Sequence, residues 1–306
     1  MAGTGRVLIV GGGVGGMSCA ISLRRAGISV DLVEIDPTWK IYGAGITITG
    51  PTLRALQTLG VLDEVTQHGA TWEGAYVYSQ TGQLIEELNF PPIAADLPGT
   101  GGIMRPKFTG QVIYRIVAER PPGFDRTHFY MGPDSKLGFN PVSRTHMYMF
   151  LLQRSPSNPW IAVEDQPRRL YDSMSGWGGI APEVRKTVMT TNAHTINYRP
   201  LEAVLLPNPW YRERVILIGD AAHATTPHLA SGAGMAVEDG IVLAEEVTRD
   251  ADIDAALPRF MKRRYERGKL VVENSLRLGE LEMIHGSPKE HSRVMMAAVA
   301  ALAQPA

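Results

Sequence analysis

The chain has 306 residues, of which 44% are hydrophobic and 20% charged, as is typical of a soluble globular enzyme with one large or two smaller domains. A formal net charge of −1 offers no basic face for nucleic acid, and a single cysteine, Cys19, cannot form an internal disulfide. No apolar run reaches the about 18 residues of a membrane helix and no signal peptide is visible, so we expect a cytoplasmic protein without membrane or nucleic-acid partners.

The sequence RVLIVGGGVGG near the N-terminus predicts a buried strand, a tight turn and the start of a helix. Gly11, Gly13 and Gly16 have the G-x-G-x-x-G spacing, which lets backbone N–H groups at a helix start approach a pyrophosphate. A second apolar strand, Ile28–Ile35, carries Glu34 about 20 residues beyond the glycines, where a ribose-binding carboxylate belongs. These features together predict a dinucleotide site, the alternative being a glycine-rich turn without a ligand.

The middle of the chain has a different pattern, with short strands instead of strands and helices in alternation. A helix is expected over residues 51–59 and a hairpin over residues 72–79 and 84–88, joined around Thr81-Gly82. Residues 89–104 are rich in proline and glycine and predict a loop. Further strands are expected at residues 111–118, 127–132, 136–142 and 145–153. Their rough alternation favours an antiparallel sheet.

The last third of the chain is mostly helical. Short helices are expected at 164–175 and 182–189, a buried strand at 214–219 and a helix at 233–248. Residues 253–283 are also helical in pattern, with interruptions expected at Pro258, Gly268 and Gly279. The pattern predicts an α/β nucleotide-binding part that is split in sequence by a sheet-rich insertion. Its parallel sheet is undersupplied, because no βα units are visible between residues 60 and 111.

A second motif, RVILIGDAAHATTPHLASGAGMAVED at residues 214–239, places a carboxylate at a strand end and a glycine-rich entry before a helix. Together with RVLIVGGGVGG, GAGITITGPTLRALQTLGVLDEV and GIMRP, it resembles the FAD-dependent aromatic hydroxylases, the group A flavoprotein monooxygenases with the para-hydroxybenzoate hydroxylase fold. The resemblance implies a Rossmann-like FAD-binding domain, an inserted, mostly antiparallel β-sheet substrate domain and a helical C-terminal tail. The implied parts are residues 1–71 and 205–250 (FAD-binding), 72–100 and 107–204 (substrate domain), 101–106 (an FAD-contacting element) and 251–306 (C-terminal helices).

The resemblance also implies roles for individual residues. The glycine turn would bind the FAD pyrophosphate, Glu34 the adenosine ribose and Asp220 the ribityl chain, and Arg105 matches an arginine that contacts FAD. The helix start near Gly234 would face the flavin N1/C2 side. The cofactor-binding residues implied in this way are Gly11, Gly13, Val14, Gly15, Gly16, Glu34, Gly45, Arg105, Asp220, Pro227, Gly232, Ala233, Gly234 and Met235.

The activity implied is hydroxylation of a phenol-like small molecule with NAD(P)H and O2, through a flavin C4a-hydroperoxide. His228, beside Pro227, is the candidate catalytic residue, and Tyr114, His146 and Tyr148 are candidates for substrate contact. His223 is expected to hold the turn in which it lies. No metal site is expected, because His223 and His228 have no third ligand at a useful spacing.

The chain departs from the family pattern after Arg105-Pro106, which runs straight into Lys107. In the family a helix, further strands and an Asp-Gly motif of the type GADGxxSxxR come between these points. That motif serves FAD and NAD(P)H binding, so its absence leaves two alternatives open. One is a related flavoprotein reductase or epoxidase, and the other is a non-catalytic flavin-binding or degenerate remnant.

Overall fold

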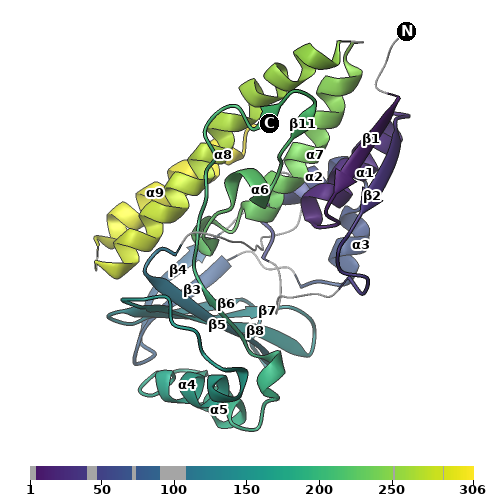
Figure 1. Cartoon of the computed structure of the whole chain (residues 1–306). Coiled ribbons are helices and arrows are strands. Elements are labelled where there is room, and N and C mark those ends of the chain that lie inside the picture. Colours follow the sequence, from purple (N-terminus) through teal and green to yellow (C-terminus); the bar gives the residue numbers. More distant parts are fainter. Residues whose placement is uncertain (1–4, 40–46, 71–73, 90–107, 251, 285) are drawn as a thin grey trace.

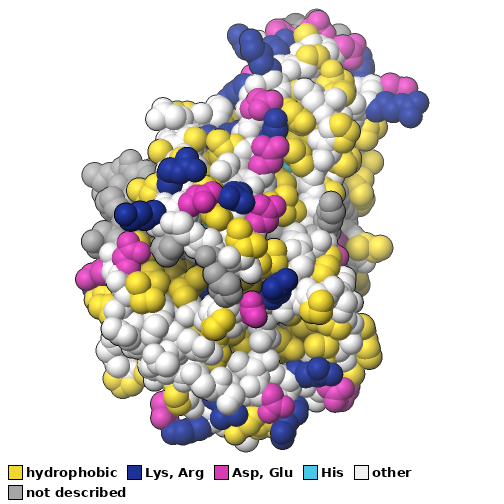
Figure 2. Space-filling model, turned by 90° about the vertical axis from the view of Figure 1, so that its left-hand side faces the viewer, with side chains coloured by type: hydrophobic (Ala, Val, Ile, Leu, Met, Phe, Trp, Pro, Cys, Tyr) yellow, Lys and Arg dark blue, Asp and Glu magenta, His cyan; other side chains and the backbone are white. Residues whose placement is uncertain are grey.

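The computed structural model describes residues 5–39, 47–70, 74–89, 108–250, 252–284 and 286–306. A large sheet divides the molecule, with two short helices, α4 and α5, on one side (Figure 1). The long helices α7, α8 and α9 and a small βαβ unit lie on the other side (Figure 1). Acidic and basic side chains are interspersed over the face drawn in Figure 2, in keeping with the near-zero net charge.

The N-terminal unit contains β1 (Arg6–Val10), α1 (Val14–Arg25) and β2 (Ser29–Val33), which confirms the predicted strand–turn–helix–strand order. The two strands are parallel, with Arg6 opposite Ser29 and Val10 opposite Val33. Helices α2 (Gly50–Thr58) and α3 (Leu62–Gln67) follow. Helix α2 is amphipathic and buries Leu53 and Leu56, two of the residues from which the helix was predicted.

Seven strands form the large sheet in the order β4-β3-β6-β7-β8-β5-β9. All pairs are antiparallel except β3 with β6, and β3 with β4 is the predicted hairpin. The strands are β3 (Gly74–Ser79), β4 (Leu84–Asn89), β5 (Gln111–Glu119), β6 (Thr127–Met131), β7 (Ser135–Pro141), β8 (His146–Arg154) and β9 (Asn197–Pro200). The first six match the expected runs, whereas β9 is too short and irregular in pattern to have been predicted.

One face of this sheet is the largest core. Side chains two residues apart share a face of a strand, so Val112, Tyr114 and Ile116 of β5 pack together with Leu151 of β8. The short helices η1 (Val163–Asp165), α4 (Gln166–Ser173), α5 (Ala181–Val188) and η2 (Ala193–Thr195) follow β8. Leu170 of α4 and residues of α5 complete this core. The opposite face of the sheet is therefore the one that turns toward the long helices.

The C-terminal third contains β10 (Tyr211–Arg212), β11 (Val215–Ile216), α6 (Asp220–His223), η3 (Pro227–Leu229), α7 (Gly232–Thr248), α8 (Ile253–Met283) and α9 (Pro288–Leu302). The interruptions expected between residues 253 and 283 are wrong, because α8 is continuous. Pro258 costs one backbone hydrogen bond, which the burial of neighbouring apolar residues offsets. Gly268 and Gly279 allow close packing, since a β carbon would lie 2.8 Å from the Trp210 ring and 2.9 Å from that of His228. None of the described helices is long and apolar enough to cross a bilayer.

The nucleotide-binding sheet is small, as the undersupply of βα units predicted. Among the described residues β1 pairs with β2 alone. The strand expected at 214–219 is reduced to β11, which pairs antiparallel with β10 and not with β1. As a result, apolar side chains of β1 face an open space, and Leu8 is 63% and Val10 80% exposed.

Candidate functional site

The glycine turn after β1 has the geometry of an anion cradle. Gly11 has a φ of +103°, which favours glycine, and its N–H donates to the Val33 carbonyl (2.8 Å). A β carbon at Gly16 would overlap the Gly11 carbonyl oxygen, so the protein itself requires glycine there. Gly13 differs, because its φ is −68° and a β carbon would meet no described residue within 4 Å. The space beside Gly13 is therefore free for a ligand.

Helix α1 begins at the end of this turn without a side-chain cap or an acidic residue in its first turn. Its first N–H groups, including those of Val14 and Gly15, thus face the cradle with the positive end of the helix dipole. Glu34 lies at the mouth, where its carboxylate accepts from Gly12 N (2.6 Å) and Asp36 N (2.9 Å). Hydrogen bonds from the N–H groups of Asp36 and Gly12 lower the pKa of Glu34. The carboxylate is held ionised and keeps acceptor capacity for a ribose hydroxyl.

Asp220 and the start of α7 meet the glycine turn in space although they lie about 200 residues further along the chain. A cavity of about 1090 Å³ connects the three segments. At its polar end the lining residues are Gly11, Gly13, Val14, Gly15, Gly16, Gly219, Asp220, Ala221, Ala233 and Ala236. Asp220 is exposed as a residue, but surrounding protein atoms exclude part of the water from its carboxyl group. This desolvation raises the pKa of the carboxyl group. The sequence-predicted pyrophosphate, ribityl and helix-dipole elements thus border one cavity.

The N-terminus of α7 carries no side-chain cap and no acidic residue in its first turn, so its N–H groups are also available to an anion. Two of the residues predicted there serve packing as well. A β carbon at Gly234 would overlap the Thr52 hydroxyl of α2. The Met235 side chain is buried against Val271 and Leu302 and is not presented to the cavity. Pro227 begins η3, and Gly232 is the first residue of α7.

A buried charge network locks the Asp220 turn onto α7 and α8. The Asp239 carboxylate contacts His223 Nε2 (2.6 Å) and accepts from Gly219 N (2.8 Å) and Arg264 Nε (2.7 Å). Arg264 also donates to Glu238 (2.7 Å), which accepts a two-pronged contact from Arg267. Burial alone would raise the pKa of Asp239, but His223 and Arg264 lower it to about 2. His223 therefore holds the turn, as expected from the sequence.

The side chain of His228 is enclosed in a second polar cluster between η3, the sheet and α8. Its Nδ1 lies 2.9 Å from the Thr226 hydroxyl, and its Nε2 lies 3.4 Å from Glu282 Oε2 without the geometry of a hydrogen bond. Lys136 of β7 donates to the same buried carboxylate (2.8 Å). Burial would raise the pKa of Glu282, yet Lys136 and then His228 hold it well below the usual value. His228 thus connects loop, helix and sheet, and its ring is almost wholly buried.

We expect Glu282→Gln to lower the free energy of unfolding by about 2 kcal/mol at pH 7, because it leaves Lys136 without a charged partner in a buried position. The difference should shrink as the pH falls below about 4, because the carboxyl group of the unfolded chain then takes up a proton while the folded carboxylate stays ionised. Urea denaturation at several pH values measures both. Glu280→Gln, an exposed site on the same helix, is the control and should cost less than about 1 kcal/mol. Equal losses in the two variants would contradict this account of the cluster.

The substrate candidates do not lie together. Tyr114 is in the core that α4 and α5 cover, and burial raises its pKa to about 12. Tyr148 belongs to the opposite face of the sheet, and His146 is exposed at the start of β8. Tyr114 and Tyr148 therefore cannot contact one substrate from the same side. Sequence reasoning missed this because β5 and β8 alternate in apolar character only roughly.

Arg115 is a functional candidate that the sequence pattern concealed. It is buried on the same sheet face as Tyr148, and its Nε has no hydrogen-bond partner among the described residues. Burial raises the pKa of Tyr148, and the neighbouring Arg115 guanidinium partly opposes this. The only sign of this role in the sequence is a charged arginine within a strand of mostly apolar residues. Gly45 and Arg105 lie outside the described residues, and within the described ranges no three metal-binding side chains form a cluster.

Comparisons with known proteins agree with this site. A family model described as "FAD binding domain" matches residues 4–129 and 184–275. "Putative FAD-dependent monooxygenase YetM" of Bacillus subtilis is 30% identical over 339 aligned positions, which cover 88% of this chain and 91% of YetM. "3-hydroxybenzoate 6-hydroxylase" of Polaromonas naphthalenivorans is 24% identical, with 92% and 88% of the two chains covered.

A solved structure has the same fold. HpxO of Klebsiella pneumoniae, in its complex with FAD and uric acid, superimposes with a TM-score of 0.80 at 19% identity, over 99% of this chain and 94% of HpxO. The family model covers well over half of the sequence, and its two matched stretches contain the glycine turn and the Asp220 turn. The chain therefore belongs to the FAD-binding-domain family of FAD-dependent monooxygenases and hydroxylases, and it is an oxidoreductase of that family.

Proposed function

We propose that this protein binds FAD in the cavity between the glycine turn, Asp220 and the start of α7, and hydroxylates a phenol-like aromatic molecule with NAD(P)H and O2. The observation that carries the cofactor assignment is the unfilled space beside Gly13, at the exposed start of α1. No described residue requires glycine at that position, whereas a bound pyrophosphate would. The proposal of an aromatic substrate is supported by the family resemblance and by the 3-hydroxybenzoate 6-hydroxylase relative.

The described residues supply binding and electrostatics. The cradle holds the pyrophosphate, Glu34 accepts from the ribose and Asp220 accepts from the polyol chain. Bound FAD supplies the redox chemistry and the activation of oxygen. The positive end of α7 stabilises negative charge at the ring edge that it faces.

Arg115 and Tyr148 are our candidates for holding the substrate on the sheet face. A guanidinium with a free Nε–H and a buried tyrosine hydroxyl can together bind a phenolate or carboxylate oxygen. The enclosed ring of His228 has a supporting role in this proposal, because its described neighbours are Thr226, Glu282 and Gly279. Its ring links the loop before α7 to Glu282 of α8, and Glu282 in turn accepts from Lys136 of the sheet.

The first test is whether the purified protein takes up FAD, measured by its visible absorbance and by fluorescence after denaturation. We expect Asp220→Asn to weaken FAD binding about tenfold, since an amide keeps the shape but loses the charge-assisted hydrogen bonds of a carboxylate. Asp172→Asn is a matched control, because that exposed carboxylate pairs with Arg168 on α4 and does not line the cavity. Unchanged FAD affinity in Asp220→Asn would count against the ribityl assignment.

A panel of phenols then tests the reaction. Substrate-stimulated NAD(P)H oxidation with a hydroxylated product would support the hydroxylase, and oxidation without such a product would favour a related flavoprotein reductase. A protein that takes up no added FAD would favour the non-catalytic remnant. The alternative of a non-catalytic remnant is supported by the edge of β1 that has no strand partner among the described residues.

A further inference from the structure

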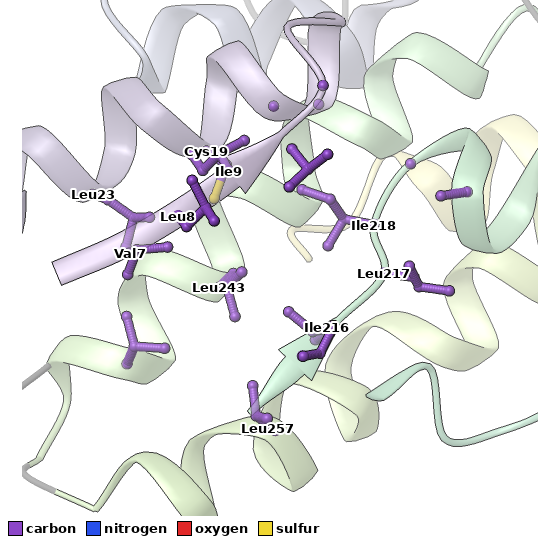
Figure 3. A pocket seen from close by; sticks show the side chains of 18 of the residues that line it. Val7, Leu8, Ile9, Cys19, Leu23, Ile216, Leu217, Ile218, Leu243 and Leu257 are labelled. Carbon is purple, nitrogen blue, oxygen red and sulfur yellow. The ribbon is translucent and has the colours of Figure 1, made fainter. Parts of the chain in front are cut away.

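The cavity beside the glycine turn continues into an apolar slot between β1 and residues 215–218 (Figure 3). One wall is β1 and α1, with Val7, Leu8, Ile9, Cys19 and Leu23 (Figure 3). The other wall is Ile216, Leu217 and Ile218, and Leu243 and Leu257 of the long helices also line the slot (Figure 3). The slot therefore has the apolar lining of a protein core and lies between two extended segments, but no described segment fills it.

Two backbone edges face this slot. β1 uses one edge for β2, and among the described residues its other edge has no strand partner. β11 likewise uses one edge for β10, and Leu217 N continues that pairing by donating to Trp210 O (2.9 Å). Both segments run in the same direction (Figure 3). The residues that follow them, Gly11 and Gly219, line the cavity proposed for FAD. One strand placed between them could pair with both edges.

The exposed side chains at the slot are of the kind that a parallel sheet normally buries. Leu8, Val10, Val215 and Leu217 are all large, apolar and 41–80% exposed. Strands of parallel sheets are normally buried on both faces and read as continuous apolar runs, as RVLIV and RVILI do. An open, apolar strand edge is also a template for pairing with another chain. The slot therefore matches a strand better than a small molecule.

The comparison with YetM shows that this chain lacks internal residues that the relative has. The aligned region is 339 positions long, whereas this whole chain has 306 residues and only 88% of them are used. YetM thus carries internal residues without a counterpart here. A chain shorter than its relative by internal residues is in keeping with an unfilled place in the sheet.

We propose that this slot accepts one extended, apolar strand from a second polypeptide, parallel to β1, and that the added strand completes the nucleotide-binding sheet. The partner is defined by its chemistry as an extended, apolar, strand-forming segment, and the internal residues that YetM has in addition are the source of the probes. The bound strand would end beside Gly11 and Gly219, so its docking would also order the mouth of the FAD cavity. The proposal does not require hydroxylase activity, because docking can be measured without FAD.

The probes are overlapping synthetic peptides of about 12 residues, since strands in globular proteins are usually 3–10 residues long. They span the internal YetM segment that has no counterpart in this chain. We expect one apolar peptide to bind the full-length protein saturably in fluorescence anisotropy and to raise the Tm by about 5 °C at a large excess over Kd. Hydrogen exchange should show new protection at residues 7–10. A version of that peptide with proline at alternate positions should not bind, since proline cannot donate the ladder hydrogen bonds.

Variants of the chain test the location. Leu8→Lys puts a charge into the slot at an already exposed position and should weaken peptide binding at least about tenfold. Leu84→Lys on β4, where the side chain is also about half exposed, is the matched control and should leave binding unchanged. Binding equal in both variants, or absent for every peptide, would overturn the proposal. Self-association of the protein that Leu8→Lys abolishes would assign the slot to a second copy and would overturn it as well.

Failure of this proposal is distinguishable from failure of the proposed function. A chain that binds FAD and hydroxylates phenols without any peptide would refute the strand acceptor and leave the hydroxylase. A chain that binds the peptide but never takes up FAD would support the slot and refute the cofactor assignment.

Discussion

Replacing Arg264 by methionine is expected to lower the free energy of unfolding by about 4 kcal/mol. The guanidinium is fully buried and donates to Asp239, Glu238 and the Met235 carbonyl. Its removal leaves the completely buried Asp239 with His223 as its remaining side-chain partner, and an uncompensated buried charge costs about 3–5 kcal/mol. Urea denaturation at pH 7 measures the loss.

The matched control is Arg214→Met, because Arg214 pairs with Asp254 where both side chains are at least 70% exposed. Such a pair contributes less than about 1 kcal/mol. If Arg264→Met cost no more than this control, the network would not hold the Asp220 turn. The double variant Arg264→Met/Asp239→Asn should recover part of the loss, since the buried negative charge is then gone.

The same network predicts an acid-sensitive part of the stability. The pKa of Asp239 in the folded state, about 2, is below the unfolded value of about 4. Its contribution is therefore complete above about pH 4 and is lost as the pH falls through 2, and it amounts to about 2 kcal/mol. Denaturation curves between pH 2 and 5 should show this component in the wild type and not in Asp239→Asn.

Gly13→Ala is expected to weaken FAD binding by about 100-fold while the fold stays intact. A β carbon at this position meets nothing in the protein, and the backbone angle is an ordinary one. It would occupy the space that a pyrophosphate needs in order to approach the start of α1. Isothermal titration with FAD and a thermal melt of the FAD-free protein separate the two effects.

Gly16→Ala is the informative comparison. Its β carbon would overlap the Gly11 carbonyl oxygen, so the variant should lose stability as well as FAD affinity. Gly69→Ala, with only an ordinary contact to the Val65 carbonyl, should change neither. Wild-type FAD affinity in Gly13→Ala would show that the free space beside this residue is not the pyrophosphate site.

Local patterns predicted most of the elements, and about half of the residues predicted to bind FAD line one cavity. The apolar run before Gly11, the alternation in 111–118 and the amphipathic helix 51–59 all matched strands or a helix, because each depends on residues close in sequence. The continuity of α8 was missed for the opposite reason. Its glycines are explained by Trp210 and His228, which approach from distant parts of the chain.

The position of a side chain on one face or the other of the sheet also required the structure. Tyr114 and Tyr148 looked equivalent in sequence, yet their strands place them on opposite faces. Arg115 looked like a surface charge and is buried with a free Nε–H. The partners of Asp239 come from the Asp220 turn and from α8, and no spacing along the chain indicates such a combination.

The sequence by itself determined that this protein has the FAD-binding motifs of its family and that its parallel sheet is short of strands. Both conclusions rest on glycine spacing and on apolar runs, which are local properties of the backbone. Only the tertiary structure decided where the shortage lies, since strand pairing joins residues about 200 positions apart. It shows an open edge of β1 opposite β11, with an apolar slot between them that leads to the cofactor cavity.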